Sequence, residues 1–466
     1  MDLRHTQVKV YRQASREISA TAAENSTQQQ DQPSTMGPNT KLPASDSPQL
    51  CLHQPTPEEC IQIWSKTAAA WKDSLTVPLY ILEAQYLTTV PLARNRGMTT
   101  WVLADASLPA NHRPLLCSSE SFRKRALASD AHGNVKECVV HGIASVFCPA
   151  EFRGRGYGSR HMRELAAALR RGWQGEGRGA SVGCVLYSDI GKRYYARLGW
   201  RPHPRNAHFA FPPAQGGVAE ETPARARAQV VAERDLGALC SRDEAMVHAA
   251  MATPCSATAR RRVVVLPDLE HMLWHIRKAD FATAYIFGKI PAAKGAAAGS
   301  APGKQVWAIW THRYYGHPDH VDEAVEGVGE AGGNVLYILR LVVEGDGTAN
   351  RPREEGRLPP LPMTEKETEE YTERKEALEA VLRAAQSEAA EWRLDSVKLW
   401  EPSPLVERMI EESGIEGVEW VEREEESIAS ALWFEEGGEG EDGGGGGDGD
   451  DGEGVVWVNN EHYAWC

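Results

Sequence analysis

One glycine-rich run contains the residues best suited to binding chemistry. It reads Val146-Phe-Cys-Pro-Ala-Glu-Phe-Arg-Gly-Arg-Gly-Tyr-Gly-Ser159 and lies between a strand-like and a helix-like segment. Glycines let the backbone turn tightly and approach a ligand closely. The helix that follows presents free N–H groups and the positive end of its dipole, which suit a phosphate. Because Arg153 and Arg155 add positive charge, the run predicts a cradle for a diphosphate.

Two familiar phosphate-binding motifs do not fit this run. The chain has no Gly-x-x-x-x-Gly-Lys-Ser/Thr motif, and the dinucleotide pattern Gly-x-Gly-x-x-Gly fails because Gly154, Gly156 and Gly158 are followed by Ser159 and Arg160. Taken alone, the run also fits a simple tight turn.

Strand and helix patterns alternate around the run. Residues 135–147 are apolar and predict a strand, while Met162, Leu165 and Leu169 recur at helical spacing after the glycines. Further strands are expected at 50–53, 99–104, 113–118, 182–186, 229–232, 263–266, 306–312, 335–343, 396–400, 429–434 and 455–459. Helices are expected at 78–90, 190–198, 269–279, 364–392 and 404–413, with others starting at residues 56–59 and at Asp243. Such alternation favours an α/β layered fold.

Composition divides the chain into two lobes. Residues 1–48 are rich in Ser, Thr, Gln and Pro, and residues 435–454 are nearly all Gly, Asp and Glu, so we expect a disordered tail and a disordered insertion. A stretch rich in Pro and Gly at 211–224 indicates a linker or long loop. We therefore expect lobes at 50–215 and 225–466. The order of elements in the second echoes the first, which suggests a duplicated domain.

Charge and cysteine content argue against several classes of protein. The net charge is −14, of which the acidic insertion supplies −9, so a nucleic-acid-binding protein is not expected. The sequence contains no apolar stretch long enough to cross a membrane. Nine cysteines without a C-x-x-C motif indicate reduced thiols and no structural metal. We expect a cytoplasmic protein, with a mitochondrial presequence as the alternative because Arg4, Lys9, Arg12 and Arg16 recur in the tail.

Two motifs resemble the hallmarks of the GNAT acetyltransferase superfamily. Arg153, Gly156 and Gly158 fit the R-x-x-G-x-G pattern that cradles coenzyme A in those enzymes. About 30 residues later, Tyr187-Ser-Asp-Ile-Gly-Lys-Arg-Tyr-Tyr-Ala-Arg-Leu-Gly-Trp200 resembles the family's second hallmark, a strand followed by a helix with Tyr and then Leu-Gly-aromatic. The resemblance implies an α/β (α+β) acyl-CoA N-acyltransferase fold with a mixed central sheet, followed here by a second GNAT-like lobe that lacks the coenzyme A motif.

Four further phrases resemble the fungal lysine N6-acetyltransferase family of lysine catabolism. They are Gly142-Ile-Ala-Ser-Val-Phe147, Leu186-Tyr-Ser-Asp-Ile-Gly191, Met272-Leu-Trp-His275 and Asn460-Glu-His-Tyr-Ala-Trp-Cys466. This similarity spans residues 50–466. It implies direct acetyl transfer from acetyl-CoA, without a metal, to the ε-nitrogen of L-lysine.

The resemblance also implies roles for individual residues. Tyr195 matches the tyrosine that protonates the leaving thiolate, and the backbone N–H of Phe147 matches the oxyanion donor. The expected coenzyme A contacts are Val146, Phe147, Cys148, Arg153, Gly154, Arg155, Gly156, Tyr157, Gly158 and Ser159. Cys148 is not expected to act as a nucleophile, because direct transfer needs none.

The sequence does not identify the general base. Glu137 and His141 lie on the strand that leads into the cradle, but Gly142 stands where some relatives have Glu. In some similar tandem aminoglycoside acetyltransferases the terminal carboxylate reaches the site, so Cys466 is a further candidate. Appending Gly-Ser after Cys466 tests this, and unchanged turnover would reject it.

The substrate contacts are equally open. For bound lysine, Arg340 is a candidate for the carboxylate and Asp189 for an ammonium group. The rival interpretations are an N-acetyltransferase for another amine or a protein lysine, and a non-catalytic, coenzyme A-binding regulatory protein. The sequence makes no prediction of oligomeric state.

Overall fold

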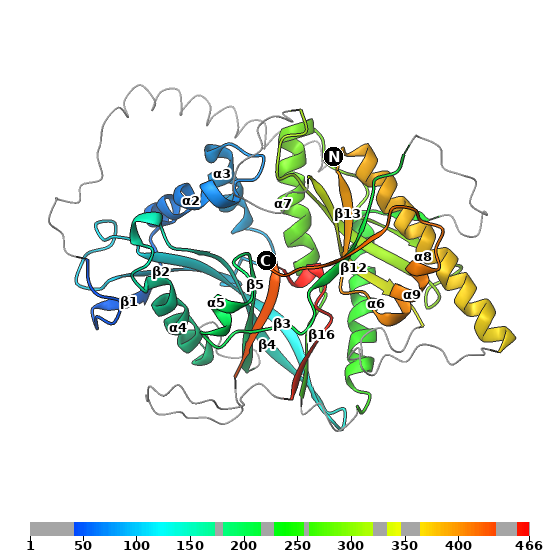
Figure 1. Cartoon of the computed structure of the whole chain (residues 1–466), viewed down its shortest axis with the longest axis horizontal. Coiled ribbons are helices and arrows are strands. Elements are labelled where there is room, and N and C mark those ends of the chain that lie inside the picture. Colours follow the sequence, from blue (N-terminus) through cyan, green and yellow to red (C-terminus); the bar gives the residue numbers. More distant parts are fainter. Residues whose placement is uncertain are drawn as a thin grey trace.

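Two mixed sheets lie side by side in the computed structural model (Figure 1). The model describes residues 42–172, 180–215, 228–255, 261–319, 333–345, 364–434 and 454–465. Within these ranges the first sheet has nine strands and the second has seven, and no helix in them is long and apolar enough to cross a membrane.

The first half of the chain supplies most of the first sheet. Its elements are β1 (Leu50–His53), α2 (Pro57–Trp71), α3 (Val77–Leu87), β2 (Met98–Asp105), β3 (Cys117–Asp130), β4 (Val135–Phe147), η1 (Ala150–Phe152), α4 (Tyr157–Arg170), β5 (Ser181–Ser188), α5 (Arg193–Ala196), β6 (Arg201–Pro202) and β7 (Ala207–Phe211).

The second half supplies most of the second sheet. Its elements are β8 (Gln229–Val231), α6 (Glu233–Met251), β9 (Arg261–Val265), α7 (Leu269–Phe287), β10 (Gly295–Ala298), β11 (Val306–Arg313), β12 (Val335–Val343), α8 (Glu365–Glu391), β13 (Ser396–Trp400), α9 (Pro404–Glu411), β14 (Glu419–Glu422), β15 (Ile428–Trp433), β16 (Val455–Val458) and η3 (His462–Ala464). In each sheet a helix joins two neighbouring parallel strands, α4 between β4 and β5 and α8 between β12 and β13.

The two sheets exchange strands. Strand β15 lies between β5 and β6 in the first sheet. Strand β9 pairs with β3 of that sheet, and β16 pairs with β9. In return, β7 lies between β13 and β14 in the second sheet. The expected division at 215–225 separates the chain in sequence, but sheet membership does not follow it.

Strands β4 and β5 separate at one end. Their parallel pairing ends at Ile143 and Leu186, while β4 continues to Phe147. Ser145 has a left-handed backbone with φ of +53°, and the register between β3 and β4 shifts between Ser118 and Glu120. This irregularity lies where the last residues of β4 run on without β5 as a partner.

Several predicted boundaries are confirmed and others are wrong. Strands β1, β4, β12 and β13 match to the residue, and α2 begins with the predicted capping box between Thr56 and Glu59. Strand β3 runs to Asp130 instead of ending at residue 118. Its polar sequence concealed it, because tertiary contacts satisfy these side chains: buried Lys124 donates to the Ala464 carbonyl at 2.6 Å. Helix α6 begins ten residues earlier than expected.

The last part of the predicted N-terminal tail is ordered. Residues 42–48 lie against α4, where the Tyr157 hydroxyl donates to the Pro43 carbonyl at 2.6 Å and Arg160 donates to the Ser45 carbonyl at 3.1 Å. The rest of the tail, and the predicted insertion up to residue 453, lie outside the described residues.

Candidate active site

A cavity of about 990 Å³ lies over the glycine-rich run, and we call it the cradle cavity. Its wall contains nine of the ten predicted coenzyme contacts: Val146, Phe147, Cys148, Arg153, Gly154, Gly156, Tyr157, Gly158 and Ser159. The tenth, Arg155, is exposed. The second half completes this wall with Arg313, Tyr315, Tyr337, Glu426, Ser427 and Trp465.

Glycine is needed at two positions of the cradle, for a different structural reason at each. Gly156 is the N-cap of α4 and has a φ of +84°, a conformation that favours glycine. At Gly158, a Cβ atom would stand only 2.8 Å from the Tyr194 hydroxyl. No side chain caps α4 among the described residues, so its first N–H groups are available to a phosphate. The cradle therefore fits a diphosphate.

The side chains beside the cradle argue against a covalent thiol mechanism. Burial raises the pKa of the Cys148 thiol, and its Sγ donates to the Leu116 carbonyl, with an Sγ–O distance of 3.4 Å. A nucleophilic cysteine needs a lowered pKa and a nearby base. Arg153 donates through Nε to the Cys148 carbonyl at 2.9 Å, which stabilises the turn.

Tyr195 lies where the cradle cavity meets a second cavity. The residue is buried on α5, and its ring contacts that of Tyr194 edge-on, with 5.0 Å between centroids. Burial raises the pKa of Tyr195, so the phenol holds its proton at neutral pH. Such a group can act as a general acid toward a strongly basic leaving group.

The second cavity has a volume of about 210 Å³, and we call it the acceptor cavity. It opens where β4 and β5 separate, and α2, α3, α7 and β11 complete its wall. Seven residues line both cavities: Trp71, Val146, Asp189, Ile190, Tyr195, Arg313 and Trp465. A thioester in one cavity and an amine in the other would meet beside Tyr195.

Charged side chains of both signs line the acceptor cavity. Lys278 of α7 donates to Glu83 of α3 at 2.7 Å, and Arg313 pairs with Asp73 at 3.1 Å. Asp189 accepts a bond from the Ser427 N–H at 3.0 Å. Glu120 of β3 accepts bonds from Ser145 and Trp64. The cavity wall therefore presents groups of both signs, and each of these two cations is paired with an acid.

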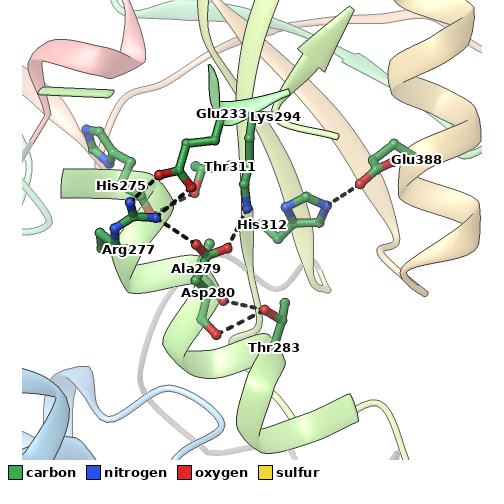
Figure 2. Close-up of polar contacts among 10 residues, drawn as sticks. All are labelled: Glu233, His275, Arg277, Ala279, Asp280, Thr283, Lys294, Thr311, His312 and Glu388. Carbon is green, nitrogen blue, oxygen red and sulfur yellow. Dashed lines mark hydrogen bonds and ion pairs between the residues drawn. The ribbon is translucent and has the colours of Figure 1, made fainter. Parts of the chain in front are cut away.

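A buried polar cluster fixes the helix that carries Lys278 (Figure 2). On the far side of α7, Asp280 accepts bonds from Lys294 at 2.5 Å and Arg277 at 3.1 Å. Thr311 of β11 donates to the His275 carbonyl at 3.0 Å. The bonds from Lys294 and Thr311 tie α7 to the second sheet, so the second half of the chain sets the position of Lys278.

Other predicted candidates lie away from the cavities. Arg340 is buried, is paired with Asp243 at 2.8 Å and with Glu461, and lines neither cavity, so it does not face a substrate there. His141 is buried in β4 outside both cavity walls, and Glu137 is largely exposed beside Arg125. Asp189, by contrast, lines both cavities.

Cys466 lies outside the described residues, but the residue just before it lies at the two cavities. His275 contacts the Tyr463 carbonyl at 3.2 Å, and Trp465 lines both cavities. The N–H of Phe147 remains a predicted oxyanion donor, since the residue ends β4 in the cradle wall.

The sequence analysis missed Glu83, Glu120, Lys278 and Arg313. Each is a charged residue on an ordinary helix or strand, far in sequence from the glycine-rich run. Only the pairing of distant elements brings them together.

A family model described as the LYC1 GNAT-like C-terminal domain matches residues 208–466. None of the curated proteins matches the sequence.

Several solved structures are distantly similar. A probable N-acyltransferase from Enterococcus faecalis is 11% identical, with a TM-score of 0.41 over 82% of this chain and 72% of that one. A GCN5-related N-acetyltransferase from Kribbella flavida is 15% identical, with a TM-score of 0.41 over 82% and 70%. The N-myristoyltransferase of Saccharomyces cerevisiae with bound myristoyl-CoA is 8% identical, with a TM-score of 0.45 over 87% and 84%. Likenesses this distant determine neither substrate nor site.

Proposed function

The chain belongs to the LYC1 GNAT-like family, and on that premise we propose that it transfers the acetyl group of acetyl-CoA directly to the N6 amine of L-lysine. The observation that carries this proposal is the meeting of the two cavities at Tyr195. One cavity presents a phosphate-binding helix terminus, and the other presents acids and cations suited to a charged small molecule.

In this proposal the cradle binds the diphosphate through the first N–H groups of α4. The pantetheine arm runs along the separated end of β4, which places the thioester near Val146 and Tyr195. The amine attacks the thioester carbon, the Phe147 N–H stabilises the oxyanion, and Tyr195 protonates the departing thiolate.

The charges of the acceptor cavity support a diamino acid as the substrate. L-Lysine carries two ammonium groups and one carboxylate at neutral pH. The carboxylates of Glu83, Glu120 and Asp189 complement ammonium groups, and Lys278 and Arg313 complement a carboxylate. A polyamine would leave these two cations without a partner on the substrate.

The test is a thiol-release assay with acetyl-CoA and a panel of L-lysine, ornithine, spermidine, an aminoglycoside and a histone-tail peptide. Turnover with L-lysine and an N6-acetyl product by mass would support the proposal. Turnover with another amine would keep the enzyme and discard the substrate. Tight acetyl-CoA binding without any acceptor would favour a regulatory coenzyme A-binding protein.

A further inference from the structure

Glu120 occupies an unusual place in the acceptor cavity. It lies at the irregularity of β3, where the register against β4 shifts. The Ser145 hydroxyl donates to its Oε2 at 3.0 Å, and the Trp64 indole N–H donates to its Oε1 at 3.4 Å. Two donors therefore hold the carboxylate in one orientation at the cavity wall.

Glu120 differs from the other acids of the cavity because it combines neutral partners with partial burial. Glu83 is paired with Lys278 at 2.7 Å, and Asp189, whose partner is a neutral backbone N–H, is exposed. Among the described residues, no lysine or arginine forms an ion pair with Glu120. Glu120 is half-buried, so its carboxylate loses part of its hydration without gaining a paired cation, and a cationic ligand would offset that loss.

The position of Glu120 also fits the reaction. Its partner Ser145 adjoins Val146, which lines both cavities. The left-handed backbone at Ser145, with a φ of +53°, belongs to the irregularity that separates β4 from β5. Glu120 is thus tied to the segment along which the thioester must lie.

We propose that Glu120 binds the acceptor ammonium and takes a proton from it, an assignment that rests on the function proposed above. The N–H bond breaks and an O–H bond forms on Glu120, which leaves a neutral amine. The nitrogen lone pair then forms the C–N bond, and the C–S bond breaks with its electrons on sulfur. Tyr195 gives its proton to the thiolate and regains one from the nitrogen of the adduct. The proton on Glu120 passes to solvent.

The electrostatic surroundings of Glu120 support this role. Burial raises the pKa of Glu120 above its usual value. The charged group that opposes this effect is Lys278 of α7. Cys60 of α2 and Tyr80 of α3 also face it, and burial raises the pKa of Cys60 to about 11 and that of Tyr80 further, so both stay neutral. A carboxylate with a raised pKa is a better base near neutral pH.

The test compares Glu120→Gln with Glu137→Gln in the full-length chain. Glu137 is an exposed carboxylate on the neighbouring strand β4, so it controls for loss of charge. The measurements are kcat and KM for L-lysine across pH, acetyl-CoA binding by calorimetry, and thermal unfolding.

We expect Glu120→Gln to lower kcat/KM about 100-fold while acetyl-CoA affinity is kept. In the parent protein the base must be ionised, so activity falls as pH falls through the raised pKa of Glu120. That acid limb should vanish in Glu120→Gln and persist in Glu137→Gln. Glu120→Asp, which keeps the base, should recover part of the rate.

The experiment distinguishes failure of the Glu120 assignment from failure of the proposed function. If the parent enzyme acetylates an amine and Glu120→Gln keeps both its rate and its acid limb, the assignment to Glu120 is wrong and the function stands. If the parent enzyme acetylates no amine in the panel, the proposed function fails, and the assignment fails with it.

Discussion

The cradle cavity and the acceptor cavity share a boundary but are built differently. The phosphate-binding part of the cradle comes from one continuous segment, residues 146–159, which a strand leads into and a helix follows. The acceptor cavity takes its charged groups from α3, β3, α7 and β11, and these elements come from both halves of the chain.

The two cavities therefore depend on different features of the fold. Phosphate binding uses backbone N–H groups at a helix terminus, so local conformation suffices. Recognition of an amine uses side chains that must converge from distant elements, so it depends on the packing between the sheets. We therefore expect substitutions in the cradle to change coenzyme affinity, and substitutions in the acceptor cavity to change acceptor kinetics.

The largest loss of activity is expected for a substitution at Tyr195, where the two cavities meet. Tyr195→Phe removes the proposed acid and should lower kcat about 10²- to 10⁴-fold, with acetyl-CoA affinity kept within about twofold. The adjacent Tyr194→Phe is the matched variant, because Tyr194 lines only the cradle cavity, and it should keep most of its turnover. A larger loss in Tyr194→Phe would transfer the acid role to that residue.

The next largest effect is expected in the cradle. Gly156→Asp puts a negative charge and a strained backbone where the diphosphate is proposed to bind, and charge-assisted bonds are worth about 1.5–3 kcal/mol each. Acetyl-CoA affinity should fall at least about tenfold in calorimetry. Gly172 has a similar φ of +77° at the other end of α4 and open space around it, so Gly172→Asp controls for backbone strain. Equal affinities in the two variants would remove the cradle assignment.

A smaller effect is expected in the acceptor cavity. Lys278→Met removes a cation proposed to bind the substrate carboxylate, and KM for L-lysine should rise about tenfold. The diamine 1,5-diaminopentane lacks that carboxylate, so its KM should change much less. Steady-state kinetics with both amines measures the difference. An equal rise in KM for both amines would instead indicate that the substitution disturbs the cavity, because Glu83 loses its ion-pair partner.

The smallest effect is expected at Cys148. Cys148→Ala removes a protonated thiol that donates to the Leu116 carbonyl, and turnover should change less than about threefold. A rapid-quench search for an acetylated protein should find none. Loss of turnover together with an acetyl-cysteine in the parent protein would instead establish a covalent mechanism.

The same contrast explains what the sequence could predict. Glycines and arginines lie together at residues 146–159 and helical spacing follows them, so the cradle is visible without a structure, whereas Tyr195 comes from the resemblance of the second motif, residues 187–200. The sequence predicts an end at residue 118 for strand β3 because Ser119, Glu120 and Lys124 are polar, and polar residues suggest exposure. The partners that hold Glu120 and Lys124 come from α2, β4 and the C-terminal segment. The full length of β3 and the position of Glu120 therefore could not be predicted for the same reason: both depend on contacts with elements distant in sequence.

Strand exchange between the sheets has a consequence for biosynthesis. Strand β5 gains its antiparallel neighbour only when β15 is made, about 240 residues later. At usual rates of translation, ~5–20 residues per second, the delay is on the order of 10–50 s. During that time the edge of β5 has unpaired N–H and C=O groups, which attract other strands. The nascent first half therefore carries an aggregation risk until the second half emerges, and we expect chaperones to bind it at this stage.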